Sequence, residues 1–245
     1  MSEQPKLRMI AGPNGSGKST FINEVIKNGQ FTIRHYINAD EIQQSFNDTK
    51  KLNFALYDIQ ISFNNFLDFT KLSTLTPKLK VPIEHICTIE KNIIILKKEE
   101  GSSYFAALVA DFIRHQMLKH KYSFEFETVM SHPDKISFLK QANELGYKIY
   151  FYFLCTESPQ INKLNVKNRV ILGGHYVPEK TIEERYYKTL SLLTQAVENA
   201  HSVYLINSNL SNFEVILQKI KGMEDIEANN LPEWYIKFYK NKSSL

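Results

Sequence analysis

Short apolar runs alternate with longer amphipathic stretches along most of the chain. The runs are typical of strands buried in a parallel sheet, and the stretches between them have the three- and four-residue spacing of helices. The runs predict strands at residues 6–11, 32–38, 122–127, 147–155 and 202–207. The stretches predict helices at residues 18–28, 102–120, 134–145, 159–171, 179–199 and 211–221. This alternation favours a doubly wound α/β domain.

One internal segment, residues 48–100, does not follow this alternation. Its first half, residues 52–72, has the pattern of a single helix, and its second half predicts two short strands around residues 90–92. No strand–helix–strand unit is visible in it. We therefore interpret residues 48–100 as an insertion or cap within a single domain that spans residues 1–245.

The last residues, 222–245, are predicted to form a tail after the core. The stretch "LPEWYIKFYK" within it predicts a short helix that docks its aromatic side chains on the core. Its Trp234 could instead stack on a base or a sugar. Packing is the commoner use of aromatic side chains, so we favour packing.

The charge and cysteine content argue against several classes of protein. The 245 residues include 30 basic and 26 acidic side chains, which gives a formal net charge of +4. A charge this small and dispersed suits an anionic ligand but does not favour nucleic acid. The two cysteines, Cys87 and Cys155, do not indicate a disulfide framework or a zinc site. Without a signal-peptide pattern or an apolar run of about 20 residues, the sequence predicts a reduced, cytoplasmic protein that has no membrane segment.

A glycine-rich turn follows the first predicted strand and precedes the first predicted helix. It fits the phosphate-loop pattern G-x-x-x-x-G-K-[ST], whose backbone N–H groups cradle phosphates at a helix N-terminus. Lys18 would reach the β- and γ-phosphates, the Ser19 hydroxyl would bind Mg²⁺, and Thr20 would touch the α-phosphate. The predicted nucleotide-binding residues are Gly12, Pro13, Asn14, Gly15, Ser16, Gly17, Lys18, Ser19 and Thr20.

The stretch "INADEI", residues 37–42, ends the second predicted strand. Ligands of open α/β sheets bind at the carboxyl ends of strands, so Asp40 or Glu41 could face the phosphates. A carboxylate there could accept the proton of an attacking hydroxyl. The equally weighted alternative is that Asp40 caps the helix that follows.

The stretch "FEFET", residues 124–128, ends the third predicted strand. Its period of two places Glu125 and Glu127 on one face, where a buried strand should not carry two unused carboxylates. Glu127 is nearer the carboxyl end and could orient an acceptor or hold Mg²⁺ through water. The alternative is a solvated edge strand.

Residues 168–190 place two arginines on either side of a Gly173–Gly174 hinge. Such a hinge lets a lid fold over a nucleotide, and Arg169 and Arg185 could neutralise charge on the phosphoryl group as it moves. From position alone, each arginine is better explained as structural, Arg169 at a helix end and Arg185 on a solvated helix. His175 could touch a phosphate, but a hydrogen bond within the loop is favoured.

Taken together and in this order, these motifs resemble the zeta toxin-like kinases. The quoted stretches are "AGPNGSGKST", "INADEI", "FEFETVMS", "LGYKIYFYFL" and "RVILGGHYVPEKTIEERYYKTL". The resemblance covers residues 7–46 and about 102–207. The pattern R-V-x-x-G-G-H-x-V-P followed by R-Y is far more specific than the phosphate loop, which many NTPases share.

The resemblance implies a P-loop kinase fold, a three-layer sandwich with a five-stranded parallel sheet of order 2-3-1-4-5 and a helical lid. It implies ATP or GTP and Mg²⁺ as cosubstrates, and often UDP-N-acetylglucosamine as acceptor, phosphorylated on the 3′-hydroxyl of its sugar. It also implies a small helical antitoxin as partner. The residues that match the family's functional positions are Lys18 and Ser19 in the loop, Asp40 as the base, Glu127 and Thr128 on the acceptor side, and Arg169 and Arg185 in the lid.

The leading hypothesis from the sequence is therefore an ATP-dependent phosphotransferase that acts on a sugar nucleotide. The long segment 48–100 departs from the family pattern and leaves the acceptor open, so another nucleotide or a small metabolite is the second hypothesis. The third is a nucleotide-dependent regulatory module that transfers no phosphate to an acceptor.

Overall fold

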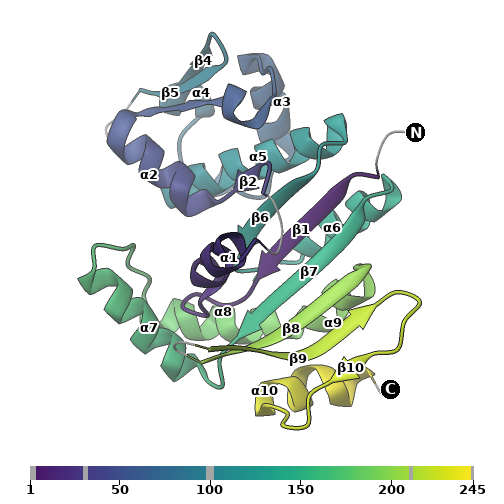
Figure 1. Ribbon diagram of the computed structural model, residues 1–245. Coiled ribbons are helices and arrows are strands. Elements are labelled where there is room, and N and C mark those ends of the chain that lie inside the picture. Colours follow the sequence, from purple (N-terminus) through teal and green to yellow (C-terminus); the bar gives the residue numbers. More distant parts are fainter. Residues whose placement is uncertain (1–3, 30–32, 98–101, 210–211, 244–245) are drawn as a thin grey trace. The chain divides into compact units, whose positions relative to one another are not determined.

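The computed structural model describes residues 4–29, 33–97, 102–209 and 212–243, and its described part divides into two compact units (Figure 1). The first unit comprises residues 1–34 and 125–245, and the second comprises residues 35–124. Residue 32 of one predicted strand, residues 98–100 of the predicted insertion, residue 211 of one predicted helix and residues 244–245 of the predicted tail lie outside the described residues.

The first unit is built on a mixed sheet. Its described strands follow the order β10-β9-β8-β7-β1-β6. Strand β7 is parallel to both β1 and β8, whereas β9 is antiparallel to both β8 and β10. The strand bounds are β1 (Lys6–Ala11), β6 (Phe124–Thr128), β7 (Lys148–Cys155), β8 (Ser202–Asn209), β9 (Asn212–Ile220) and β10 (Ile226–Glu227).

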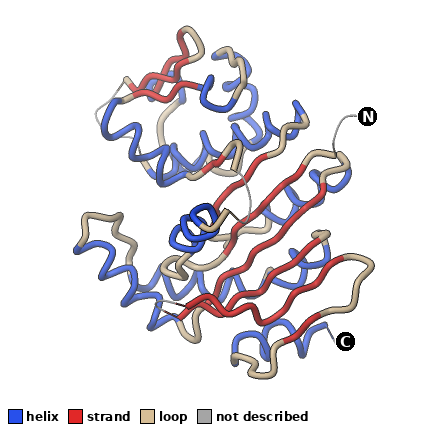
Figure 2. The backbone as a smooth tube through the Cα atoms, in the orientation of Figure 1, coloured by secondary structure: helices blue, strands red, loops and turns tan. Residues whose placement is uncertain are grey.

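Helices connect these strands (Figure 2). Helix α6 contacts β7, and the neighbouring helices α7 and α8 contact each other. The predicted helix at 179–199 is present as two helices, because the chain turns at Leu192. The bounds are α1 (Lys18–Lys27), α6 (Asp134–Glu144), α7 (Pro159–Ile171), α8 (Glu179–Ser191), α9 (Leu193–Glu198), α10 (Glu233–Tyr235), a π-helical turn (Ile236–Lys240) and α11 (Asn241–Ser243).

The core of this unit lies against one face of the central strands, whose side chains are fully buried. Leu7, Ile149, Phe151, Phe153 and Leu205 are each 0% exposed. Burying a side chain of this size contributes about 1.5–3 kcal/mol relative to leaving it in water. The opposite face of β7 is half-buried and carries Tyr150 and Tyr152, so aromatic side chains on that face extend the apolar run that predicted this strand.

The predicted sheet of five parallel strands is wrong in one respect, because an antiparallel strand replaces a predicted helix. Residues 211–221 were expected to be helical, yet Asn212–Ile220 form β9. A bulge shifts the register opposite Leu205 and Ile206, so that adjacent Ile216 and Leu217 are both buried. An inserted residue of this kind breaks the period of two, which leaves an apolar spacing that resembles a helix.

The tail docks on the first unit, as predicted. Trp234 is 2% exposed, and its indole Nε1 donates a hydrogen bond of 3.1 Å to Asn207 Oδ1. Its ring centroid lies 5.8 Å from that of Phe153 in β7. Packing on the core, with the N–H satisfied, is therefore the role of this tryptophan.

The second unit combines a small antiparallel sheet of order β3-β5-β4 with several helices. Helix α5 contacts both α2 and α3. The bounds are β2 (Tyr36–Ile37), α2 (Ala39–Thr49), β3 (Lys51–Asn53), a 3₁₀ turn (Phe54–Tyr57), α3 (Phe63–Leu72), a second 3₁₀ turn (Thr76–Leu79), α4 (Ile83–Ile86), β4 (Cys87–Glu90), β5 (Ile93–Leu96) and α5 (Ser103–His120).

The two short strands predicted around residues 90–92 are confirmed as β4 and β5. Lys91 and Asn92 join them with φ angles of 48° and 66°. Two consecutive positive φ angles are the mark of a tight hairpin turn, whose twist matches that of the flanking strands.

The single helix predicted at residues 52–72 is wrong. Asn53 Oδ1 accepts a hydrogen bond of 2.9 Å from the Ala55 N–H, and Asp58 has a φ angle of 55°. Ser62 and Asn65 then form a capping box that starts α3. Short polar side chains bind nearby backbone groups in this way and compete with a continuous helix.

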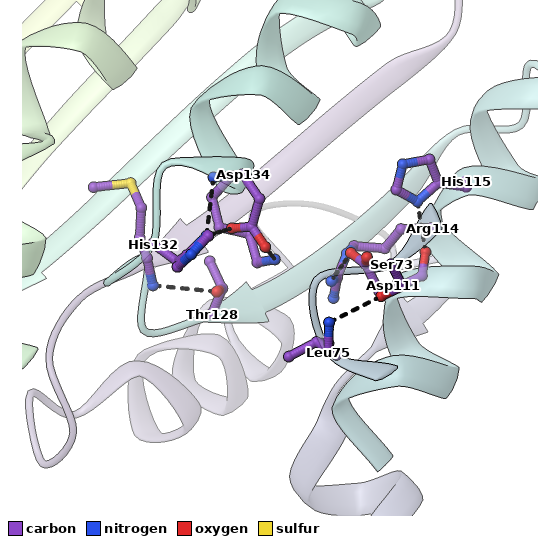
Figure 3. A network of polar contacts seen from close by, with 10 residues as sticks. Ser73, Leu75, Asp111, Arg114, His115, Thr128, His132 and Asp134 are labelled. Atoms are coloured by element: carbon purple, nitrogen blue, oxygen red, sulfur yellow. Dashed lines mark hydrogen bonds and ion pairs between the residues drawn. The ribbon is translucent and has the colours of Figure 1, made fainter. Parts of the chain in front are cut away.

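The core of the second unit is aromatic. Phe66, at 0% exposure, has its ring centroid 5.1 Å from Phe112 and 6.3 Å from Phe105 of α5. On the same helix, Arg114 is buried and its guanidinium lies 2.5 Å from the Asp111 carboxylate (Figure 3). This charge therefore has its counterion one turn away, which a buried arginine requires.

Candidate phosphate-binding site

Residues 12–17 form the loop that joins β1 to α1, as the motif predicts. Gly12 and Gly15 have φ angles of 153° and 76°, which favour glycine. A Cβ atom would lie 2.1 Å from the Leu154 carbonyl oxygen at Gly12 and 2.5 Å from the Asn162 carbonyl oxygen at Gly15. The loop therefore packs too closely against β7 and α7 for a side chain at either position.

Lys18 is the first residue of α1, and its side chain is held inside the loop. It is 6% exposed, and its Nζ donates hydrogen bonds of 2.9 Å to the carbonyl oxygens of Gly12 and Pro13. Helix α1 begins after Gly17 without a side-chain cap. An ammonium group beside uncapped helix N–H groups is an arrangement that binds phosphate.

Ser19 lies next to the carboxylate of Glu127. Its Oγ donates to Glu127, at 3.1 Å from Oε1 and 3.0 Å from Oε2. A hydroxyl and a carboxylate are hard oxygen ligands, the type that Mg²⁺ prefers. The pair therefore fits a magnesium ion whose other ligands would be phosphate oxygens and water.

The neighbouring carboxylate, Glu125, has a different role. It is 1% exposed, and its Oε1 lies 2.5 Å from Arg8 Nη1 on the adjacent strand β1. Its Oε2 accepts a hydrogen bond of 3.3 Å from the Arg34 N–H. The two glutamates of "FEFET" thus have different roles, because Glu125 pairs with the half-buried Arg8 and Glu127 reaches the loop.

Thr128 contacts the phosphate loop through its backbone. Its carbonyl oxygen accepts a hydrogen bond of 3.3 Å from the Gly12 N–H. Its hydroxyl oxygen accepts from the Met130 N–H at 3.2 Å, in a turn where Met130 has a φ angle of 56° (Figure 3). An acceptor-binding role for Thr128 stays a prediction.

Two asparagines of α7, which the sequence analysis did not identify, bind the phosphate loop directly. Asn162 Nδ2 donates to the Asn14 carbonyl oxygen at 2.6 Å, and Asn165 Nδ2 donates to the Gly15 carbonyl oxygen at 2.9 Å. Residues three apart share one face of a helix. The signal available in the sequence was therefore a pair of short amides on one face of a predicted helix.

A buried chain of hydrogen bonds extends this contact to α8. The Thr156 hydroxyl is bonded to Asn162 Oδ1, and the Thr156 carbonyl oxygen accepts from the Tyr186 hydroxyl at 2.8 Å. Thr156 and Asn162 are 0% exposed and Tyr186 is 3% exposed. Burial raises the pKa of the Tyr186 hydroxyl, which therefore stays a donor.

Arg185 reaches the phosphate loop from α8. Its Nη1 donates a hydrogen bond of 3.2 Å to Asn14 Oδ1. Nearby, Lys163 Nζ of α7 lies 2.6 Å from Glu183 Oε2 and ties the two helices together. The alternative that Arg185 is an ordinary solvated arginine is therefore wrong, because its side chain binds the phosphate loop.

Arg169 is instead engaged at the connection between α7 and α8. Its Nη2 donates a hydrogen bond of 3.0 Å to the His175 carbonyl oxygen, and its own carbonyl oxygen accepts from the Gly174 N–H at 2.9 Å. A Cβ atom on Gly174 would lie 2.6 Å from Arg169 Cγ. In this conformation Arg169 holds the hinge, and His175 contributes its backbone to that contact while its side chain is exposed.

Asp40 belongs to the second unit, where it lies in the first turn of α2. The alternative that Asp40 caps this helix is wrong, because Asn38 is the cap and its Oδ1 accepts a hydrogen bond of 2.9 Å from the Asp40 N–H. The side chains of Asp40 and Glu41 are both exposed. The role of Asp40 as general base stays a prediction.

The zeta toxin family model matches residues 97–216. This range includes Glu127, Thr128, Asn162, Arg169 and Arg185, but not the phosphate loop. The loop and the family match are therefore independent observations.

One curated relative is an uncharacterized protein of Haemophilus influenzae. It is 29% identical over 72 residues, which is 29% of this chain and 51% of the relative. The match thus spans about half of the relative's length.

Several solved structures share the fold. The AvrRxo1-ORF1:ORF2 complex aligns with a TM-score of 0.59 and 13% identity over 96% of this chain and 63% of that chain. The same complex solved with ATP aligns with a TM-score of 0.59 and 14% identity, with the same coverage. The PezAT toxin–antitoxin system of Streptococcus pneumoniae aligns with a TM-score of 0.50 and 11% identity over 96% of this chain and 77% of that chain.

These similarities assign the fold. The chain has an α/β P-loop kinase-like fold with a mostly parallel central sheet. It spans less than two thirds of the AvrRxo1-ORF1:ORF2 chain that it matches. Within the described part of the chain, no helix is both long and apolar enough to cross a membrane.

Proposed function

We propose that this protein is a nucleotide-dependent phosphotransferase that transfers the γ-phosphoryl group of ATP or GTP to an alcohol. One observation carries the proposal: the phosphate loop holds a buried lysine and is met by an arginine of α8 through Asn14 Oδ1. Such positive groups around a phosphate loop suit transfer, because they offset charge on the moving phosphoryl group.

The loop offers donors that suit a triphosphate. The Ser16 hydroxyl is buried and has no hydrogen-bond partner among the described residues, so it has donor capacity for a ligand. Lys18 can exchange two carbonyl contacts for phosphate oxygens, which are stronger partners for an ammonium group. Lys18 and Arg185 would then lie on the phosphates.

Ser19 and Glu127 would hold Mg²⁺, Ser19 directly and Glu127 through water. The ion would supply positive charge that offsets the charge of the phosphates. The carboxylate already accepts from the Ser19 hydroxyl at 3.0 Å, so the two groups are close enough to share one ion.

Asp40 is proposed as the general base. Its carboxylate would take the proton of the acceptor hydroxyl, whose oxygen bonds to the γ-phosphorus while the bond to the β,γ-bridging oxygen breaks and ADP leaves. Glu127 and Thr128 would lie on the acceptor side. Arg169 would join Arg185 on the transferring group if the hinge at Gly174 turned it away from His175.

The proposed acceptor is a sugar nucleotide such as UDP-N-acetylglucosamine. This acceptor class rests on the motif resemblance alone, whereas the family match over residues 97–216 supports the phosphotransferase and not its acceptor. The alternatives are another nucleotide or small metabolite as acceptor, and a regulatory module that transfers nothing.

Incubation with γ-labelled ATP and a panel of acceptors tests the proposal. We expect label on UDP-N-acetylglucosamine with the wild-type protein and none with Lys18→Ala. Label on a different acceptor would support the kinase activity and reject a sugar nucleotide as its acceptor. Nucleotide binding without transfer to any acceptor would favour the regulatory module.

A small helical antitoxin is the proposed partner. Structural neighbours were solved as AvrRxo1-ORF1:ORF2 and within the PezAT toxin–antitoxin system, which supports this proposal. Expression in a bacterial host checks it. Growth arrest that Lys18→Ala abolishes is expected, whereas normal growth with active enzyme would remove the toxin role and leave the kinase.

A further inference from the structure

We infer that Asn162 and Asn165 are positioning residues that set the phosphate loop for triphosphate binding, an inference that rests on the proposed function. Both lie on α7, far from the loop in sequence. Their side-chain amides bind two consecutive carbonyl groups of the loop, at 2.6 Å and 2.9 Å.

The first contact fixes the orientation of a whole peptide unit. The Asn14 carbonyl and the Gly15 N–H belong to one planar trans peptide, so they point in opposite directions. Asn162 holds the carbonyl toward α7, and the Gly15 N–H is therefore directed away from α7. A nest for phosphate needs its N–H groups turned inward, which requires its carbonyl groups to be satisfied on the outside.

The second contact fixes the next peptide, whose N–H is bonded within the loop itself. Asn165 holds the Gly15 carbonyl, and the N–H of that peptide, from Ser16, donates to the Pro13 carbonyl oxygen at 3.3 Å. The peptide is thus held at both ends. Two adjacent peptides of the loop are therefore fixed by one face of one helix.

The donor role of Asn162 follows from its surroundings. The Asn14 carbonyl oxygen only accepts hydrogen bonds, so the amide NH₂ of Asn162 must face it. This leaves Oδ1 facing the Thr156 hydroxyl, to which it is bonded. Asn162 is 0% exposed, so losing either contact would leave a buried polar group without its partner.

Helix α8 completes the clamp on Asn14. Tyr186 donates to the Thr156 carbonyl oxygen at 2.8 Å, and Arg185 binds Asn14 Oδ1 at 3.2 Å. Asn14 is therefore held at its backbone by α7 and at its side chain by α8. A change in the position of these helices would alter the phosphate loop directly.

The close approach of α7 also limits which side chain can act at 162. A Cβ atom on Gly15 would lie 2.5 Å from the Asn162 carbonyl oxygen, so the helix backbone itself borders the loop. Only a short amide spans such a gap without pushing the loop away. Aspartate has the same shape but replaces the donor with an acceptor, which makes Asn162→Asp the informative substitution.

Titration with inorganic triphosphate, read by calorimetry, tests the inference on the full-length protein. We expect Asn162→Asp and Asn165→Asp each to weaken binding about ten- to a hundredfold, the range for losing a buried hydrogen bond. Asn168→Asp is the matched control, because it places the same charge on an exposed position of the same helix. It should bind within about twofold of wild type.

Thermal unfolding without ligand separates positioning from folding. A purely structural asparagine would lower the unfolding temperature and leave the affinity of the folded protein unchanged. Asn165 is only half-buried, so Asn165→Asp serves if Asn162→Asp fails to fold.

Wild-type affinity in either folded variant, or an equal loss in Asn168→Asp, would overturn the inference while leaving the proposed function intact. Absence of triphosphate binding by the wild-type protein would instead reject the proposed function and the inference with it.

Discussion

Arg185 Nη1 lies 3.2 Å from Asn14 Oδ1, so a helix near the end of the chain meets the loop near its beginning. The two residues are 171 positions apart in sequence. Their contact places a guanidinium group at the loop whose neighbouring Lys18 is buried. The proposed transfer rests on this pairing.

Replacing Arg185 should impair transfer much more than binding. By analogy with arginine fingers, Arg185→Ala should lower kcat by about 10³–10⁵. Single-turnover phosphorylation, with nucleotide Kd measured separately, checks this expectation. Arg169→Ala is the comparison, because Arg169 binds the His175 carbonyl in the present conformation. A decrease of less than about tenfold in both variants would exclude the proposed role of the arginines.

Replacing Asp40 should abolish transfer and leave nucleotide binding nearly unchanged. The general base contributes about 10²–10⁴ in rate, so Asp40→Asn should lose activity by that factor. Glu41→Gln, at the adjacent and equally exposed position, is the control and should stay active. Comparable activity of Asp40→Asn and wild type would remove Asp40 from the mechanism.

Gly15→Ala should destabilise the protein more than Gly146→Ala. Both glycines have similar φ angles, 76° and 83°, so the backbone strain of about 1–2 kcal/mol is shared. A Cβ atom at Gly15 meets the Asn162 carbonyl oxygen at 2.5 Å, whereas nothing lies within 4 Å at Gly146. The clash should add about 1–3 kcal/mol to the loss, measured by urea unfolding. An equal decrease in the free energy of unfolding for both variants would show that the loop accommodates a Cβ atom at Gly15 without a steric penalty.

The stability of the chain should decrease as the pH falls below 6.5, in part through His201. Burial, with Lys221 and Lys148 nearby, lowers the pKa of His201 from 6.5. The unfolded chain therefore binds a proton on this histidine at a higher pH than the folded chain, and protonation favours unfolding. His201→Gln should flatten the dependence of the unfolding temperature on pH between about 7.5 and 5.5. An unchanged slope would assign the acid sensitivity to other groups.

The sequence by itself determined the phosphate loop and the strands around it. Gly12, Gly15 and Lys18 occur at a spacing that the loop requires, and the strand before and the helix after it are local patterns. The four runs that became β1, β6, β7 and β8 were recognisable because nearly all of their positions are buried or half-buried, which favours apolar and aromatic residues. The tryptophan of the tail was likewise predictable from its size and apolar character.

Only the tertiary structure decided features that depend on distant contacts. Residues 212–220 became a strand because β8 offered a partner and a bulge, although their spacing resembled a helix. Glu125 and Glu127 have similar local sequence, yet Arg8 binds one and Ser19 the other. Residues 52–72 are a further example. Their apolar pattern predicts one helix, but hydrogen bonds between the side chains of Asn53 and Ser62 and the backbone divide the segment.

The asparagines of α7 show the physical reason most clearly. Asn162 and Asn165 lie 148 and 150 positions from their partners in the loop, and their shared helix face does not indicate which group their amides bind. Local sequence encodes backbone preference and burial, whereas a hydrogen bond also needs an acceptor that the fold brings to within 3 Å of the donor. The loop was therefore readable from the sequence, and the residues that hold it were not.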